Sequence, residues 1–349
     1  MLAVVCRHAP DWDTVRRHTI VPRPDHRQIL GQHGVPDNGY WNEAACYELE
    51  LAQVGQLSRA TEELHSMCLA AAHHAVRDDR VAELGIPDWA AAGVVESLEA
   101  QPPTLLGHID LWYDGTGDPR FLAYRAEDLT GLLETSVAQW FWVEQVRPGD
   151  DQCNILHRRL VEAWEIGSRK LASDLIHLAW SPDEPTGIDE ATIGYLAETA
   201  QQAGLHTPRV PITSIGWNGK RFLDADGAPI DTCFKLYPWE WMLDEPYGRL
   251  ALEHQGTTAW VEPVWKAMLS SPALPALLWE LYPDHPNLLP VGPDGRPEVP
   301  PLPEFDGCRV VVSSWVVTAG GGRATAAGAG FIEYDGRRPT FVPHFVPKS

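Results

Sequence analysis

Positive charge is scarce in this sequence. Among 349 residues there are 27 lysines and arginines against 48 aspartates and glutamates, so the formal net charge is −21. The only lysines are Lys170, Lys220, Lys235, Lys266 and Lys348. Because such a chain repels phosphate backbones, we expect no nucleic-acid partner. The acidity either keeps the protein soluble, which is the commoner role of net charge, or attracts a cationic substrate such as a polyamine.

Cysteine motifs and long apolar runs are also missing. The six cysteines are scattered with no C-x-x-C pair, so we expect reduced, mostly buried thiols and no zinc site. No stretch approaches the ~18 apolar residues of a membrane span, and the apolar opening at residues 1–6 is too short for a signal peptide. We therefore expect a cytoplasmic protein without a membrane partner. No G-x-G-x-x-G follows a predicted strand, so nothing indicates a dinucleotide site.

The composition is typical of a folded protein, and the length allows two domains or one large domain with an appendage. Hydrophobic residues make up 44% and charged residues 21%, which argues against long disorder. Residues 1–40 hold many prolines and polar residues, which predicts an irregular lead-in. Between residues 41 and 80, apolar side chains recur every three or four positions. This spacing predicts either one helix or two, with Ser58 as the candidate cap of a second.

The middle of the chain predicts a hairpin and a βαβ unit. Strand-like segments at 104–113 and 120–125 flank a turn-rich segment, and a helix at 129–145 follows. Farther on, helices at 152–165 and 190–203 and strands at 174–180 and 210–217 are indicated. A strand–helix–strand segment of this length gives a parallel pair. The C-terminal third predicts a short strand within 231–245, a broken helix at 265–281, a loop at 288–303, and strands at 309–318 and 328–334.

Several segments, in order along nearly the whole chain, carry a specific resemblance. They are Tyr-Trp-Asn-Glu at 40–43, Gly-His-Ile-Asp at 107–110, Lys-Leu-Tyr-Pro-Trp-Glu-Trp at 235–241, Glu-Pro-x-Trp-Lys at 262–266, His-Pro-Asn-Leu-Leu at 285–289 and Phe-Val-Pro-His-Phe at 341–345. In this order they resemble the glutathionylspermidine synthase family. The resemblance implies an α/β (α+β) fold, namely a permuted ATP-grasp-like fold with a βαβ pre-ATP-grasp region and N-terminal helices.

The resemblance also implies a division of the chain and a chemistry. Residues 1–104 would form the lead-in and helices, 105–150 the ATP-grasp-type hairpin and helix, 151–217 the pre-ATP-grasp region, and 218–349 a C-terminal ATP-grasp-like region with a shortened nucleotide lid. Family members are carboxylate–amine ligases that use ATP and Mg²⁺. They phosphorylate a carboxylate, and a small amine then displaces the phosphate.

The resemblance places the site residues at eight positions. Asp110 would bind the metal, Lys235, Tyr237 and Trp239 the nucleotide, and Glu240 and Glu262 the substrate, with His108 and Arg125 as catalytic candidates. Each position has an ordinary structural alternative. The aromatic residues could pack the two lobes, the two glutamates could be surface charges, and His108 could be a structural histidine.

The sequence departs from the family at the metal ligands and at the lid. His108 stands at the family's arginine, Ala123 at its glutamate and Arg125 at its asparagine. Magnesium prefers oxygen ligands, whereas arginine offers five donors and no acceptor, so we expect Arg125 to pair with Asp110. The lid lysine is also missing, since no lysine lies between Lys266 and Lys348.

Three hypotheses follow from the retained and the missing residues. The first is an ATP-dependent ligase that joins a peptide or amino-acid carboxylate to an amine. The second is a catalytically inactive binding or scaffold protein on a ligase fold, which works with an intact paralogue or another protein partner. The third is an altered enzyme that uses His108 and Arg125 without ATP.

Overall fold

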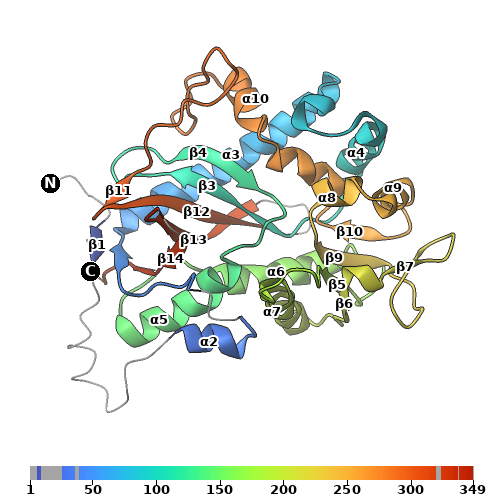
Figure 1. Ribbon diagram of the computed structural model, residues 1–349, viewed down its shortest axis with the longest axis horizontal. Helices are drawn as coiled ribbons and strands as arrows, with labels where there is room; N and C mark the ends of the chain where they lie inside the picture. Colours follow the sequence, from blue (N-terminus) through green and yellow to red (C-terminus); the bar gives the residue numbers. More distant parts are fainter. Residues whose placement is uncertain (1–5, 9–25, 36–38, 320–323, 337, 349) are drawn as a thin grey trace.

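The computed structural model describes residues 6–8, 26–35, 39–319, 324–336 and 338–348 (Figure 1). The predicted lead-in at 1–40 lies mostly outside these ranges. Its described part includes the short strand β1 (Cys6–His8) and helix α2 (Arg27–Gln32). Within the described ranges, no helix combines the length and the apolar composition that crossing a bilayer requires.

One of the two main sheets is antiparallel. Its strands run in the order β14-β13-β12-β3-β4, and β11 pairs with β12 at one end. The bounds are β3 (Leu106–Trp112), β4 (Arg120–Arg125), β11 (Glu304–Phe305), β12 (Cys308–Thr318), β13 (Ala324–Tyr334) and β14 (Thr340–Val342). The predicted hairpin is confirmed as β3 and β4, and the two predicted C-terminal strands as β12 and β13. The strand that completes the sheet beside β3 therefore comes from the far end of the sequence.

One long helix, α3 (Leu51–Arg77), packs against β12 and β13. Of the two predicted alternatives, one helix or two, the structure has a single helix. The Ser58 hydroxyl donates to the carbonyl oxygen of Val54 inside this helix and does not cap a second helix. The helix begins later than residue 41. Residues 46–48 form β2 (Cys46–Glu48) instead, and Glu50 and Gln53 make a capping box at the helix start.

The other main sheet is parallel, with strand order β10-β9-β5-β6. The bounds are β5 (His177–Trp180), β6 (Arg209–Pro211), β9 (Thr232–Leu236) and β10 (Ala259–Val261), with α6 (Leu156–Ser168) and α7 (Ile188–Gln202) packed beside them. The predicted βαβ unit is confirmed as β5-α7-β6. Its second strand is shorter than predicted, because Pro211 has no amide hydrogen to donate and a 3₁₀ turn follows at Ile212–Ser214.

The remaining elements connect the two sheets. Strands β1, β2 and β15 (His344–Phe345) form a small third sheet, and β7 (Gly216–Trp217) pairs with β8 (Phe222–Leu223). The other helical segments are 3₁₀ turns at Val81–Leu84 and Val264–Ser270, a π-helical turn at Glu134–Ala138, and helices α4 (Asp88–Ala100), α5 (Gln139–Val146), α8 (Trp239–Leu243), α9 (Pro246–Glu253) and α10 (Leu274–Leu281). Figure 1 shows α8 and α9 close to β9 and β10. The two sheets meet at the start of β3, where the backbone amides of Leu105 and Leu106 bond to Glu262, the residue after β10.

Candidate functional site

Asp110 lies on β3 in the middle of the hairpin, opposite Ala123 of β4. The Arg125 Nε donates a hydrogen bond to the Asp110 Oδ2 over 3.0 Å. The Ser313 hydroxyl, from the neighbouring strand β12, donates to the Asp110 Oδ1 over 2.9 Å. Both carboxylate oxygens of Asp110 are therefore engaged by protein donors, as the sequence predicted for Arg125.

His108 shares a face of the strand with Asp110, because side chains alternate along a strand. Its Nε2 lies 3.6 Å from the Asp110 Oδ1, and its ring lies 4.7 Å from the ring of Trp315, centroid to centroid. The imidazole is almost completely buried, and burial lowers the pKa of His108 below its ordinary value. Burial therefore favours the neutral form of the ring.

Lys235 is buried near the end of β9 and is held by a carboxylate from the segment that follows β4. Its Nζ donates to the Glu127 Oε1 and to the carbonyl oxygen of Tyr237, each over 2.8 Å. The ammonium also lies 4.5 Å from the ring centroid of Trp239. Burial lowers the pKa of Lys235, and the charge of Glu127 opposes that shift. The pair joins the segment after β4 to the parallel sheet.

Glu262 belongs to a second buried ion pair. Its Oε1 accepts hydrogen bonds from the backbone amides of Leu105 and Leu106, each over 2.9 Å, and its Oε2 accepts one from the Lys266 Nζ over 2.8 Å. The same ammonium donates to the carbonyl oxygen of Leu106. Lys266 and Glu262 thus fix the start of β3, and the Glu262 carboxylate points away from open solvent.

The other predicted residues fall in different places. Trp239 is buried, with its indole nitrogen donating to the backbone oxygen of Glu262 over 2.8 Å. Glu240 and Trp241, on α8, are exposed. The Tyr237 hydroxyl donates to the Glu245 carboxylate. The eight residues therefore do not converge on one point.

A cleft of about 440 Å³ lies between the segment at the end of β4, α8 and the turn that precedes α10. We call it the hairpin cleft. Among its lining residues are Arg125, Glu127, Asp128, Glu240 and Asp244. Acidic groups outnumber basic ones on its walls, and its one arginine is paired with Asp110. Among the described residues, no three histidine, cysteine or acidic side chains gather as a metal site would require.

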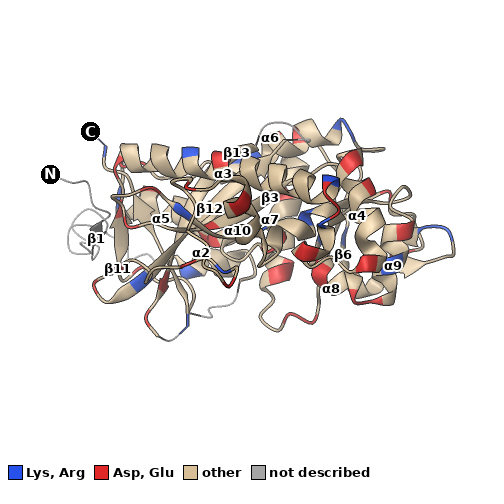
Figure 2. Cartoon of the chain, turned by 90° about the horizontal axis from the view of Figure 1, so that it is seen from above, with Lys and Arg blue, Asp and Glu red and all other residues tan. Residues whose placement is uncertain are grey.

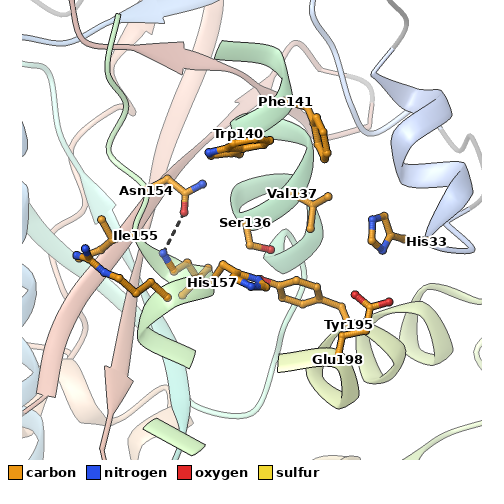
Figure 3. A pocket seen from close by; sticks show the side chains of 12 residues that line it. His33, Ser136, Val137, Trp140, Phe141, Asn154, Ile155, His157, Tyr195 and Glu198 are labelled. Carbon is orange, nitrogen blue, oxygen red and sulfur yellow. Dashed lines mark hydrogen bonds between the residues drawn. The ribbon is translucent and has the colours of Figure 1, made fainter. Parts of the chain in front are cut away.

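A separate cavity of about 550 Å³ lies between α2, α5, α6 and α7 (Figure 3). Its walls include Trp140 and Phe141 on one side and the pair of His157 and Tyr195 on the other, with 3.1 Å between the His157 Nδ1 and the Tyr195 hydroxyl. None of the eight predicted residues lines it.

Sequence reasoning missed the partners that hold the predicted residues. Glu127 neutralises Lys235, Ser313 bonds to Asp110, and Lys266 fixes Glu262. A buried lysine in an apolar strand does signal that a carboxylate must pair with it. Which carboxylate does so depends on tertiary contacts between segments 108 residues apart.

Similarity to known proteins identifies the family of this chain. A profile described as "Glutathionylspermidine synthase preATP-grasp" matches residues 17–301. The chain belongs to this family. It is 34% identical over 255 residues to a Haemophilus influenzae protein named "Putative acid--amine ligase", an alignment that covers 72% of this chain and 64% of that protein.

Two relatives with lower sequence identity are named as synthetases. The Escherichia coli bifunctional glutathionylspermidine synthetase/amidase is 24% identical over 262 residues, which cover 67% of this chain and 41% of that protein. The trypanothione synthetase of Crithidia fasciculata is 22% identical over 255 residues, covering 65% and 38%. This chain therefore spans less than two thirds of the length of these three relatives.

A solved structure supports the fold assignment. A glutathione synthetase-like effector from Globodera pallida superposes with a TM-score of 0.54 over 95% of this chain and 100% of that chain, at 11% sequence identity. At this identity the likeness concerns the fold alone. The chain has the predicted mixed α/β fold with an ATP-grasp-like arrangement.

Proposed function

We propose that this chain keeps the carboxylate–amine ligase architecture of its family without the magnesium-dependent ATP step, and that it acts in the cytoplasm as a binding protein for a small amine or carboxylate. The observation that carries this proposal is the pairing of Arg125 with Asp110 across the hairpin. The free, buried thiols of Cys68, Cys153 and Cys233 agree with a reducing compartment.

The groups around Asp110 do not fit a magnesium ion. Magnesium needs an octahedron of oxygen ligands, and here both Asp110 oxygens accept hydrogen bonds while the opposite residue, Ala123, has no ligand atom. The guanidinium of Arg125 adds a positive charge where a cation would have to lie.

The hairpin cleft does not suit a triphosphate either. Phosphoryl-binding sites depend on positive groups that neutralise the phosphate oxygens. Lys235, the retained family lysine, is instead neutralised by Glu127, and Glu240 and Asp244 add negative charge to the cleft. Binding a polyanion there would require breaking a buried ion pair.

A working ligase is the second candidate, and family membership favours it. The 34% identity to the Haemophilus influenzae protein and the retained Asp110 support an enzyme that rebuilds the ATP site from other residues. A complete lid from elsewhere in the chain would have to supply the missing positive charge.

Calorimetric titration with ATP, with and without MgCl₂, separates the two candidates. We expect no heat of binding up to millimolar ATP under either condition. Micromolar binding that requires magnesium would overturn the proposal and lead to a ligase screen with amine and carboxylate pairs.

A rebuilt site provides a positive control. In the double variant Ala123→Glu, Arg125→Asn, two oxygen ligands would face Asp110, so we expect Mn²⁺ binding by titration that the native chain lacks. The variant Arg120→Asn, on the same strand but outside the site, serves as the matched control. Equal Mn²⁺ affinity in the native chain and the double variant would contradict our reading of the ion pair.

A further inference from the structure

A third cavity lies at the carboxyl ends of β5, β6 and β9, where those strands give way to loops and to α8 and α9. We call it the sheet-edge pocket. It has a volume of about 350 Å³ and is lined by Ser181, Asp183, Ile212, Thr213, Ile215, Phe222, Tyr237, Met242, Glu245, Tyr247 and Trp260. In open parallel sheets, ligands bind in the crevice beyond the carboxyl ends of the strands. From its lining, we propose that the sheet-edge pocket binds a compact organic cation of the quaternary ammonium class.

Four aromatic rings form much of the pocket wall. Phe222 and Trp260 are buried and pack edge to face, with 5.2 Å between ring centroids. Tyr237 and Tyr247 lie nearer the opening, and Tyr247 is 47% exposed. The faces of aromatic rings attract cations, and cages of such rings are the usual receptors for methylated ammonium groups.

The charges around the pocket all have one sign. Asp183 and Glu245 are the only carboxylates among its lining residues, and those residues include no lysine, arginine or histidine. The Tyr237 hydroxyl donates to the Glu245 carboxylate, and the negative charge of Asp183 also acts on Tyr237. The two carboxylates therefore make the opening attractive to a cation and repellent to phosphates and carboxylates.

Trp260 supplies an independent sign of a ligand. Its side chain is 5% exposed and lines the pocket, yet its indole nitrogen has no hydrogen-bond partner among the described residues. An unpaired buried donor is costly unless something accepts its hydrogen. A cation that carries a hydroxyl group would provide the acceptor.

The apolar part of the lining narrows the class of cation. Ile212, Ile215 and Met242 offer contact surface but no hydrogen bonds. A primary ammonium brings three N–H donors that each need an acceptor, whereas a trimethylammonium group has none and is weakly hydrated. The aromatic and aliphatic walls therefore suit the methylated cation, and the two carboxylates supply its counter-charge. The pocket shares no lining residue with the hairpin cleft, and Tyr237 is its only lining residue among the eight predicted site residues.

The test is a titration of the full chain with choline. Binding is measured by tryptophan fluorescence and by calorimetry. Its matched probe is 3,3-dimethyl-1-butanol, which has the same shape without the charge. We expect choline to bind roughly tenfold or more tightly than the neutral probe, as cation–π contacts and two carboxylates would give. Equal binding of the two, tighter binding of n-butylammonium than of choline, or no choline binding at about 10 mM would each overturn the proposal.

Single substitutions test whether choline binds in the sheet-edge pocket. Tyr247→Ala removes an exposed ring and Glu245→Gln removes a charge near the surface, so neither change disturbs the core. We expect each to weaken choline binding several-fold. Glu240→Gln, which removes one charge from the hairpin cleft, is the control and should leave choline binding unchanged. Loss of binding in the control alone would assign the cation to the other cleft and contradict the proposal.

Discussion

Lys235 and Lys266 place two of the few positive charges of this chain in its interior. Each is held by one glutamate, Glu127 or Glu262, with 2.8 Å between the nitrogen and the oxygen. A buried ion pair contributes little net stability, but the removal of one partner leaves the other charged and desolvated. Lys235 and Lys266 therefore stabilise contacts between separate segments of the chain, in addition to any role in binding.

Lys235→Met tests this structural role. The change leaves Glu127 buried, with the backbone amide of Trp239 still donating to its Oε2 over 3.0 Å. We expect the free energy of unfolding to fall by about 3–5 kcal/mol, measured by urea denaturation. The double variant Lys235→Met, Glu127→Leu should recover much of this loss. Unchanged stability in the single variant would show that the pair is dispensable.

Prediction from sequence succeeded at residues where local pattern determines the contact. Arg125 and Asp110 lie on adjacent strands of a hairpin whose turn was recognisable, so their pairing could be foreseen. Tyr237 and Glu240 lie three residues apart, yet they line different cavities. That separation arises because α8 begins between them, at Trp239. The functional roles of all eight site residues stay predictions.

At the scale of single elements, helices and strands with a clear repeat were predicted well, and breaks in the repeat were not. The hairpin, α7 and β12 follow the predicted segments closely. The segment at 129–145 is helical, but it contains a π-helical turn at Glu134–Ala138 that no simple periodicity indicates. Such turns depend on tertiary packing and often accompany functional sites. The four-part division of the chain also stays a prediction.

The π-helical turn carries a buried carboxylate with a measurable effect. Burial raises the pKa of Glu134 to about 7, above its ordinary value. A raised folded-state pKa means that its contribution to stability is full below about pH 4.5 and is lost as the pH rises through about 7. Relative to Glu134→Gln, the native chain should therefore lose about 3 kcal/mol of unfolding free energy between pH 4.5 and pH 8. Urea denaturation at both pH values measures this difference.

Glu144→Gln, an exposed position on α5, is the control for the pH experiment. It should show no such difference from the native chain. If Glu134→Gln also tracks the native chain across this range, the carboxylate is not desolvated in the folded protein.

The junction of α8 and α9 depends on one glycine. A methyl group at Gly248 would overlap with the carbonyl oxygen of Met242, so the two helices could not keep their present approach. We expect Gly248→Ala to lower the free energy of unfolding by about 1–3 kcal/mol or more. It should also weaken choline binding, because Met242, Glu245 and Tyr247 come from this junction. Thermal denaturation with Gly256→Ala, where the added methyl group meets open space, is the comparison.

Charge is the dominant property of the whole molecule. The 48 acidic residues exceed the 27 basic ones, and Figure 2 shows the positions of acidic residues spread over many elements, including α8 and α9. Like charges at this density repel each other in the compact state, and salt screens them. We expect the midpoint of thermal unfolding to rise when NaCl is increased from about 20 mM to about 500 mM. A falling midpoint would mean that attractive ion pairs outweigh the net repulsion.

The order of strands in the antiparallel sheet has a consequence for biosynthesis. Strand β3 ends at Trp112 and its central neighbour β12 begins at Cys308, so 195 residues are made between them. At roughly 5–20 residues per second, the open edge of β3 waits on the order of 10–40 s for its partner. An unpaired edge invites pairing with other nascent chains, and an inward-pointing charge discourages it. Asp110, in the middle of that edge, would thus protect the growing chain on the ribosome before it has any part in the finished site.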